Sequence, residues 1–401
     1  MMSDVSSVPS TIRLLILLSR LRLSPSQSEA ALRLCPDISD WGEVTQEAKR
    51  HFVLPLVYRH LNDLEPPGLP REALDRMRQT SIAMTRHNLC VVAAQRHLMR
   101  EVLGPQAIPH LFFKGPALAA RYYGDPAGRF CRDIDLLVAH KDMVRLLEAA
   151  VASGYRLLKP DGMTPDRQSL TFAVDVHPVI TLMSPLGVPV ELHRRLDTTG
   201  AIYDTDSLLA RTENLALGGG RVSVMPTDEL FVYLCLHHTR HRWSHLHWLA
   251  DLDVMQRSPD FDLQAVHACA VRRGLVSTVE ASLALYRACA GIGDPRVAVV
   301  ASHGRELLSV CLTNLQGDRR VELAQRQRNI TTDFAFSWQS TMIHRWSHRL
   351  HNWLMVWRPS YSDYRPMPLR PHWQWVYRLT RPFRAMGKYF IRLVTPDAPS
   401  K

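Results

Sequence analysis

The sequence predicts an α+β fold, in which a small mixed sheet forms a core between helical regions. Short apolar runs that end at turns containing glycine or proline cluster between residues 106 and 225. Longer segments with apolar residues three and four positions apart lie on both sides of that stretch, which indicates amphipathic helices. Strand-length runs in the middle and helical periodicity at both ends together favour this fold class.

Four segments follow from these patterns. They are a helical region over 1–105, the sheet core over 106–225, a helical domain over 226–330, and a basic, aromatic-rich segment over 331–401. The flanking regions contain predicted helices at 12–23, 28–34, 41–61, 71–102, 263–271, 279–290 and 297–315. Turn-forming residues separate them, for example Pro66-Pro67-Gly68 before the helix at 71–102.

The core contains the predicted strands. They cover 111–113, 133–138, 155–158, 170–176, 188–192, 214–217 and 221–225. A helix at 141–153 follows the second of these, and Gly154 is its expected C-cap. Gly218-Gly219-Gly220 predicts a hairpin turn between the last two strands.

Two aspartates lie two positions apart in the strand at 133–138. Asp133 and Asp135 would project from the same side, because successive side chains of a strand alternate between its faces. Two carboxylates about 6 to 7 Å apart repel each other unless a positive charge lies between them. A hard divalent cation such as Mg²⁺ supplies that charge, typically with phosphate oxygens and water as its other ligands. The pair therefore indicates a metal site.

Positive groups precede the acidic pair. Lys114 and Gly115 stand where the strand at 111–113 ends and a helix begins. Gly115 allows close approach of the backbone, and the helix N-terminus together with Lys114 favours an anion. Arg129 and Arg132 add positive charge shortly before Asp133. This stretch thus has the character of a phosphate-binding region.

A third carboxylate is expected on a neighbouring strand. Glu191 lies within 188–192, with His193 on the same face, and Asp175 in 170–176 is the alternative. Carboxylates that converge from two strands suit a metal-assisted transfer of a phosphoryl or nucleotidyl group.

In this order the motifs resemble the uncharacterised nucleotidyltransferase family of the DNA polymerase beta-like superfamily. The resemblance covers roughly residues 45–260 and is carried by Lys114-Gly115, the Gly-Asp-Pro-Ala turn at 124–127, Arg129, the run 133–138 and Val190-Glu191-Leu192-His193. The turn departs from the superfamily pattern, because Lys-Gly stands where polymerase-like enzymes usually show Gly-Ser, and the gap to Asp133 is longer.

The resemblance implies a nucleotidyltransferase-type sheet core and assigns roles to its residues. Asp133, Asp135 and Glu191 would be the catalytic metal ligands, and Glu191 is preferred to Asp175 because Glu-x-His after Pro189-Val190 matches the family pattern. The nucleotide would be contacted by Lys114, Gly115, Arg129 and His193.

A histidine-rich stretch follows the core. His237, His241 and His245 are spaced by four residues, which predicts one shared helix face. The glutamate of an H-E-x-x-H zinc site is missing from this stretch. The family shows a similar helix, matched here by His238, Trp243, Trp248, Asp251 and Leu252, which would form a wall of the nucleotide pocket. In the alternative, the two tryptophans are core residues and the histidines lie on the surface.

Composition narrows the class of protein. The net charge is +11, with 46% hydrophobic and 22% charged residues, as in an ordinary globular protein. Residues 338–401 hold eleven Lys and Arg against two Asp, so the rest of the chain is nearly neutral, which argues against specific nucleic-acid binding. The seven cysteines form no C-x-x-C pair, and neither a signal peptide nor a membrane-spanning stretch is evident. A cytoplasmic protein is expected.

The C-terminal segment combines its charge with aromatic residues. Trp346, Leu350, Trp353 and Trp357 fall on one face of a predicted helix, and Phe383, Met386, Phe390 and Leu393 form a second apolar stripe. Basic helices of this kind bind membrane interfaces or acidic partners. Packing of these aromatics on the helical domain is the alternative.

The predicted function is transfer of a nucleoside monophosphate from a nucleoside triphosphate to an unidentified acceptor hydroxyl, with Mg²⁺ or Mn²⁺ as cofactor. The alternative is a non-catalytic nucleotide-binding or regulatory module of the same fold, with a place in surface glycan biosynthesis. Retention of all three carboxylates favours the enzyme.

Overall fold

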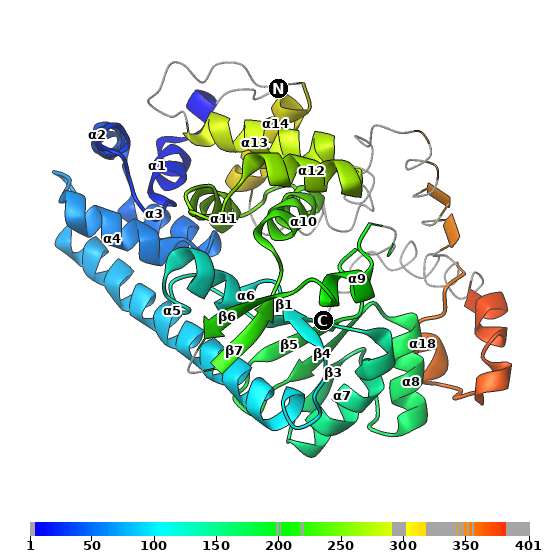
Figure 1. The fold of residues 1–401 in the computed structure, drawn as a ribbon. Coiled ribbons are helices and arrows are strands. Elements are labelled where there is room, and N and C mark those ends of the chain that lie inside the picture. Colours follow the sequence, from blue (N-terminus) through cyan, green and yellow to red (C-terminus); the bar gives the residue numbers. More distant parts are fainter. Residues whose placement is uncertain are drawn as a thin grey trace, which may run out of the picture. The chain divides into compact units, whose positions relative to one another are not determined.

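A computed structural model of the chain describes residues 5–197, 200, 202–217, 220–290 and 302–317, together with 342, 346, 349–350, 353–354 and 357–381. The described part confirms the α+β class, with seven strands and a majority of helical residues (Figure 1). Contacts divide the chain into two compact units. The first comprises Met1–Val92, Lys114–Cys131 and Glu213–Met342, and the second comprises Ala93–Phe113, Arg132–Thr212 and Ile343–Lys401. The four contiguous segments stay a prediction.

The second unit contains five strands in the order β3-β4-β5-β2-β1. Their bounds are β1 His110–Phe112, β2 Ile134–Val138, β3 Arg156–Lys159, β4 Val179–Met183 and β5 Pro189–His193. β2 pairs with β5 in parallel, and the other pairs are antiparallel, so the sheet is mixed as predicted. All five residues of β2 are buried, which agrees with a central strand covered on both faces.

Strand register aligns polar side chains from four strands in one row. Asp135 pairs with Glu191, Glu191 with Thr181, and Thr181 with Lys159. Residues that pair across neighbouring strands point to the same face of a sheet. The row therefore runs over β2, β5, β4 and β3 on one face, from two carboxylates to a hydroxyl and an amine.

Helices flank this sheet within the second unit. They are α7 (His140–Ala152), α8 (Arg167–Val176), α9 (Thr205–Leu209) and α18 (Tyr361–Tyr364). α7 packs against α8, and α18 lies beside α8 (Figure 1). The C-cap of α7 is Ser153, one residue before the predicted Gly154. Gly154 follows it with a φ of 86°, a left-handed conformation that favours glycine after a helix.

The strand predicted over 170–176 is wrong, because this segment belongs to α8. The Asp166 side chain accepts a hydrogen bond from the Ser169 backbone N–H over 2.9 Å and caps the helix. A short, mainly apolar segment of seven residues cannot be assigned to strand or helix by periodicity alone. The strand that the sequence analysis missed is β4, which begins three residues after α8 ends.

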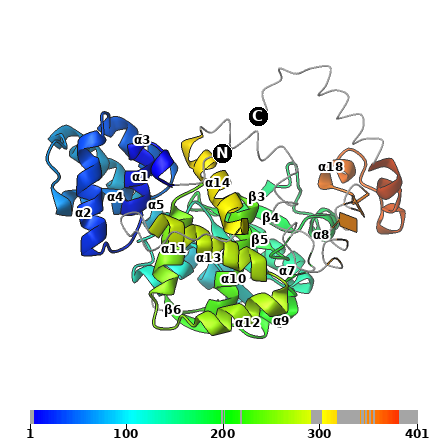
Figure 2. The ribbon, with the colours of Figure 1, turned by 90° about the horizontal axis from the view of Figure 1, so that it is seen from above.

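The described residues of the first unit are mainly helical and include the hairpin of β6 (Glu213–Leu217) and β7 (Gly220–Val224), whose turn was predicted. Its helices are α1 Ser10–Leu18, α2 Pro25–Leu34, α3 Trp41–Arg50, α4 Leu54–Leu64, α5 Arg71–Leu98, α6 Gly115–Leu118, α10 Thr227–Arg240, α11 His247–Gln256, α12 Leu263–Arg273, α13 Val276–Ala290 and α14 Ser302–Gln316, with the last residues of α5 in the second unit. α1 to α4 pack together (Figure 2). Ser24 and Gln27 form the capping box of α2.

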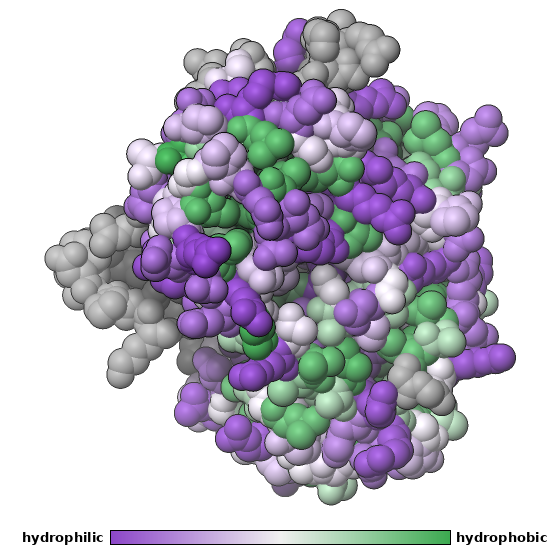
Figure 3. All heavy atoms as spheres, turned by 90° about the vertical axis from the view of Figure 1, so that its left-hand side faces the viewer, coloured by the Kyte–Doolittle hydropathy of each residue, from purple (hydrophilic) through white to green (hydrophobic). Residues whose placement is uncertain are grey.

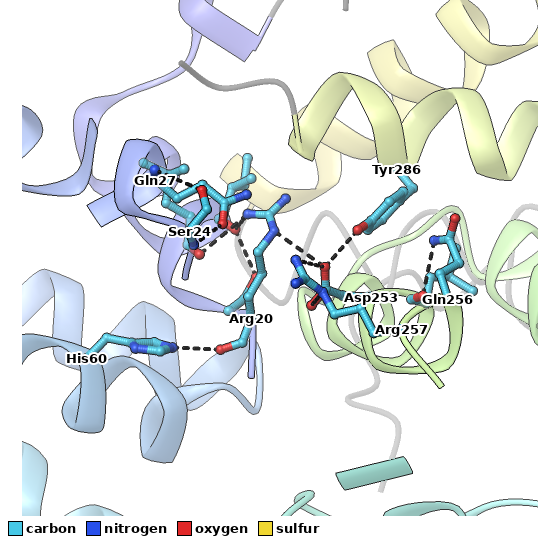
Figure 4. A network of polar contacts seen from close by, with 12 residues as sticks. Arg20, Ser24, Gln27, His60, Asp253, Gln256, Arg257 and Tyr286 are labelled. Atoms are coloured by element: carbon cyan, nitrogen blue, oxygen red, sulfur yellow. Dashed lines mark hydrogen bonds and ion pairs between the residues drawn. The ribbon is translucent and has the colours of Figure 1, made fainter. Parts of the chain in front are cut away.

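A buried arginine joins α1 to two other helices of the first unit. The Arg20 guanidinium donates to the Ile16 carbonyl oxygen over 3.1 Å, near the end of α1. Its Nε lies 3.7 Å from Asp253 Oδ1 of α11, which also accepts from the Tyr286 hydroxyl of α13. Figure 4 shows these contacts together with the hydrogen bond from His60 to the Arg20 carbonyl oxygen. Asp253 also pairs with Arg257 over 3.1 Å. Loss of Asp253 would therefore leave the buried Arg20 without its carboxylate partner, whereas loss of Arg20 would leave Asp253 paired with Arg257.

Hydrophilic and hydrophobic side chains are interspersed on the face of the molecule shown in Figure 3. Among the residues that the structure describes, no helix is both long and apolar enough to cross a membrane. The predicted stripe from Phe383 to Leu393 lies outside the described residues.

Residues 360–377 pack on α8 through aromatic side chains. The Phe172 ring stacks on Tyr364 at a centroid distance of 4.5 Å and meets Tyr377 edge-on at 5.4 Å. All three residues are buried. Aromatic pairs of these geometries contribute about 0.5 to 1.5 kcal/mol beyond the burial of their area, so they hold this segment on the helix.

A histidine provides a polar contact to the same segment. The Tyr361 backbone N–H donates to His177 Nε2 over 3.0 Å, which requires that nitrogen to be unprotonated. Burial lowers the pKa of His177 below its usual 6.5, and the charges of Arg194 and Arg381 lower it further. The folded state therefore holds His177 neutral.

The free energy of unfolding should decrease as the pH falls below 6.5. The unfolded chain takes up a proton at His177 more readily than the folded chain does, so the contribution of this residue is complete above 6.5 and is lost towards its lowered pKa. The loss is at most about 1.4 kcal/mol per pH unit. Urea unfolding at pH 7.5 and 5.5, of the natural chain and of His177→Gln, measures it.

The comparison isolates His177 because glutamine keeps an acceptor and does not titrate, while all other titrating groups are shared. We expect His177→Gln to lose less stability than the natural chain between the two pH values. An equal loss in both proteins would show that His177 does not respond to pH in this way.

Candidate metal and nucleotide site

Three side chains that can ligate a cation meet on β2 and β5 of the second unit. They are Asp135, Glu191 and His193, and one ligand atom of each lies within 4.8 Å of those of the other two. Glu191 and His193 are two residues apart on β5, so their side chains leave the same face. The parallel register places Asp135 beside Glu191. The strands of the sheet, rather than loops, position this group.

The three side chains differ in exposure. Asp135 is 5% exposed, His193 11% and Glu191 36%. His193 Nε2 lies 3.1 Å from Asp135 Oδ1 and 3.5 Å from Glu191 Oε2, and the Phe113 ring packs edge-on against the imidazole at 5.2 Å. A buried carboxylate is costly unless a positive group compensates it. Glu191 is the member of the group that an incoming molecule reaches most easily.

The donor set fits a divalent cation. Carboxylate oxygens are preferred ligands of Mg²⁺ and Mn²⁺, and imidazole nitrogen also binds transition metals such as Mn²⁺ and Zn²⁺. Asp135, Glu191 and His193 could hold such an ion together. His193 is predicted to contact the nucleotide, and its distances to both carboxylates make it a candidate ligand of the cation as well.

The other two predicted acids lie elsewhere. Asp133 directly precedes β2 and is half-buried, and among the described residues it is outside the group of converging ligand atoms. Asp175 is on α8, where its exposed carboxylate lies 2.9 Å from His140 Nε2. The structure therefore brings Glu191, and not Asp175, beside Asp135. Metal binding by Asp133 stays a prediction.

The predicted phosphate contacts Lys114, Gly115 and Arg129 belong to the first unit. Gly115 begins α6 with a φ of 62°, in the left-handed region that favours glycine. Lys114 Nζ lies 3.2 Å from His237 Nε2 of α10. Contact of these residues with phosphate stays a prediction.

Arg129 pairs with Asp251, a residue of the predicted histidine-rich helix motif, and this pairing was not predicted. Arg129 Nε and one terminal nitrogen donate to the two carboxylate oxygens of Asp251, over 2.6 and 2.7 Å, and the Tyr123 hydroxyl donates to the same carboxylate over 2.9 Å. Burial lowers the pKa of Arg129, but attraction by the Asp251 carboxylate has the larger effect, so the pKa of Arg129 is raised above its usual value. This pair anchors the segment around Arg129 to α11.

The histidine-rich stretch does not form the single helix face that its spacing predicted. α10 ends at Arg240, and Arg242 and Trp243 adopt φ values of 55° and 51°, which break the helix before His245. Trp243 is fully buried, and its indole N–H donates to Thr239 Oγ1 over 3.2 Å. The turn places this indole in the core of the first unit.

Two of the histidines are enclosed. The His238 ring stacks on Trp248 at a centroid distance of 4.7 Å. Burial lowers the pKa of both His237 and His238 well below 6.5, and the charge of Lys114 lowers each further. These imidazoles are therefore neutral. Their predicted place in a nucleotide pocket stays a prediction.

Two residues of the polar row were missed from the sequence. Thr181 is on β4, which was not predicted, and Lys159 is the last residue of β3. The composition Val-Ile-Thr-Leu-Met is typical of a strand, so β4 could have been predicted from the sequence. Only the strand register shows that Thr181 lies on the same face of the sheet as Glu191.

Comparison with known protein families agrees with this geometry. Residues 37–291 match a family described as uncharacterised nucleotidyltransferase. The matched range contains β1 to β7 and the group formed by Asp135, Glu191 and His193. No curated protein matches the chain.

Asp251→Asn should destabilise the protein strongly. Loss of one partner leaves the Arg129 charge buried and uncompensated, which costs about 3 to 5 kcal/mol. Denaturant unfolding followed by circular dichroism measures the change.

Glu29→Gln serves as the control, because its ion pair with Arg33 is largely exposed and should contribute almost nothing. The double variant Arg129→Met/Asp251→Leu removes both charges of the Arg129–Asp251 pair. It should therefore be more stable than Asp251→Asn, which leaves the Arg129 charge buried. Equal stability of Asp251→Asn and the natural chain would refute the structural role of the pair.

Proposed function

Because the chain belongs to the uncharacterised nucleotidyltransferase family, we propose that it transfers a nucleoside monophosphate from a nucleoside triphosphate to an acceptor hydroxyl. The observation that supports this reaction is the convergence of Asp135, Glu191 and His193 on one face of the sheet. Mg²⁺ or Mn²⁺ is the proposed cofactor. A cation held there would neutralise charge on the phosphate oxygens during transfer.

The two carboxylates have different proposed tasks. Asp135, which is almost fully buried, is a fixed ligand. Glu191 is more exposed and can both ligate the cation and accept the proton of an acceptor hydroxyl. Asp133, next to β2, is a proposed additional ligand. The family pattern supports Lys114, Gly115 and Arg129 as proposed contacts of the triphosphate.

His193 is a proposed ligand and positioning residue. Its imidazole lies between Asp135 and Glu191 and packs against Phe113, so both carboxylates have a defined neighbour. A restrained ligand group loses less conformational entropy when a cation binds.

Asp135→Asn should abolish metal-dependent nucleotide binding. Replacement of a carboxylate oxygen by an amide removes the charge that attracts the cation, and we expect the affinity for Mn²⁺ to fall at least about tenfold. Calorimetric titration of Mn²⁺ alone, and of each nucleoside triphosphate with Mg²⁺, measures both effects without relying on turnover.

Asp175→Asn is the matched control, because it removes an aspartate of the same unit whose exposed side chain contacts His140. Its binding should equal that of the natural chain. Equal losses in both variants would argue against the assigned site, and a well-folded natural chain that binds no triphosphate would favour a non-catalytic module.

A membrane surface is a second proposed partner. Trp346, Leu350, Trp353 and Trp357 are 62%, 57%, 61% and 40% exposed, and their spacing places them on one helix face. Eleven Lys and Arg against two Asp in 338–401 complement an anionic surface. Exposed tryptophans beside basic residues suit the interface of a bilayer.

Trp346→Ser/Trp353→Ser should weaken binding to vesicles that contain anionic phosphatidylglycerol. Less apolar area would enter the interface, so the bound fraction in a co-sedimentation assay should fall several-fold. Leu89→Ser is the control, since it removes an exposed apolar residue of α5. Unchanged sedimentation of the double variant would exclude the stripe as the membrane contact.

A further inference from the structure

A pocket of about 980 Å³ lies over β4 and β5 of the second unit, and Glu191 is one of its lining residues. It is lined by Lys159, Pro160, Asp161, His177, Val179, Thr181, Glu191, Ser360, Ser362, Arg365 and Pro366. Its size is that of sites for small organic molecules. Because Glu191 belongs both to this lining and to the candidate metal group, a molecule in the pocket would lie next to that group.

The floor of the pocket follows the polar row of the sheet. Glu191 pairs with Thr181 across β5 and β4, and Thr181 pairs with Lys159 of β3 after a shift of register between Leu157 and Lys159. Neighbouring strands are about 4.8 Å apart, so the backbone at Lys159 lies about 10 Å from that at Glu191. The floor thus has a carboxylate at one end, an amine at the other, and a nearly buried hydroxyl between them.

The C-terminal segment supplies the wall. Ser360, Ser362 and Arg365 lie outside the range matched by the family and come to the pocket because Tyr361 and Tyr364 pack on α8. The capping box of Ser360 and Asp363 shapes this turn, and Arg381 pairs with Asp363 at 3.4 Å. The wall is therefore held by contacts of Tyr361, Asp363 and Tyr364, which are buried and do not line the pocket.

Arg365 approaches the backbone at Gly162, the residue after Asp161 of the lining. A Cβ atom at Gly162 would lie 2.6 Å from Arg365 Nε, and Gly162 has a φ of 76°. Only glycine allows this approach without displacement of the guanidinium. Lys159 and Arg365 thus provide two positive charges, with Asp161 as the one carboxylate of the lining besides Glu191.

We propose that this pocket binds the acceptor, and that the acceptor is a phosphate-bearing polyhydroxy compound of about monosaccharide size. This inference rests on the proposed nucleotidyl transfer. Lys159 and Arg365 bind the phosphate group, because guanidinium and ammonium groups commonly donate charge-assisted hydrogen bonds to phosphate oxygens. Thr181, Ser360 and Ser362 match hydroxyl groups, and one acceptor hydroxyl points to Glu191.

The transfer step balances with the nucleoside triphosphate as the second reactant. The acceptor oxygen forms a bond to the α-phosphorus, and the bond from that phosphorus to the oxygen bridging to the β-phosphate breaks. Pyrophosphate leaves with that bonding pair. The proton of the acceptor hydroxyl passes to the Glu191 carboxylate.

Calorimetry of the full chain without nucleotide tests the acceptor site. The probes are a hexose phosphate, the unphosphorylated hexose and inorganic phosphate. The hexose phosphate should bind most tightly, and Lys159→Ala or Arg365→Ala should weaken it about tenfold each, as expected for loss of a charge-assisted bond. Inorganic phosphate should bind weakly to the same residues, and the hexose should show little heat.

Two further variants keep the test specific. Arg370→Ala removes an exposed arginine that does not line the pocket, so it should bind the hexose phosphate as the natural chain does. Gly162→Ala displaces the Arg365 side chain without deleting it and should reproduce the loss. Thermal unfolding of each variant confirms that it is folded.

The outcomes separate this inference from the proposed function. Binding of a triphosphate with Mg²⁺, but no preference for hexose phosphate over hexose, would overturn the acceptor assignment and leave nucleotidyl transfer standing. Loss of triphosphate binding in Arg365→Ala, with hexose phosphate binding unchanged, would make this the nucleotide pocket and also overturn it. Hexose phosphate binding that depends on Arg365, without any triphosphate binding, would support the pocket and refute the transfer.

Discussion

Parallel pairing of β2 with β5 is the contact on which the candidate site depends. It places Asp135 beside Glu191 and brings His193 onto the same face. β2 is buried along its whole length, so the Asp135 carboxylate is held in a position where water cannot compensate its charge. A divalent cation is the positive group that this arrangement suits. A change in register of one residue would turn these side chains to the other face and remove the site.

Compensation of buried charge is also required in the first unit, where two arginines are buried against aspartates of one helix. Asp251 and Asp253 of α11 bind Arg129 and Arg20, which come from two distant segments of the preceding chain. Buried ion pairs contribute little net stability relative to apolar side chains, but they strongly disfavour structures in which one partner is missing. These pairs therefore specify which segments assemble on α11.

The pocket beside Glu191 is lined partly by residues within the family match and partly by residues outside it. Its floor lies within the range matched by the nucleotidyltransferase family, and its wall comes from residues 360–366 outside that range. Aromatic packing of Tyr361, Tyr364 and Tyr377 on Phe172 makes the wall part of the second unit. Such a division would allow one reaction centre to act on an acceptor selected by a separate segment of the chain.

The sequence by itself determined the α+β class, most of the helices, the two aspartates and the Glu-x-His motif, because these depend on local periodicity, turn residues and short spacings. It failed at Leu170 to Val176, where Asp166 caps a helix that a short apolar run does not distinguish from a strand. Only the tertiary structure decided that Asp135, Glu191 and His193 converge without Asp175, that Arg129 pairs with Asp251, and that Lys159 and Thr181 continue the row. Each of these depends on strand register or on the burial of charges from distant segments, and neither leaves a signal in neighbouring residues.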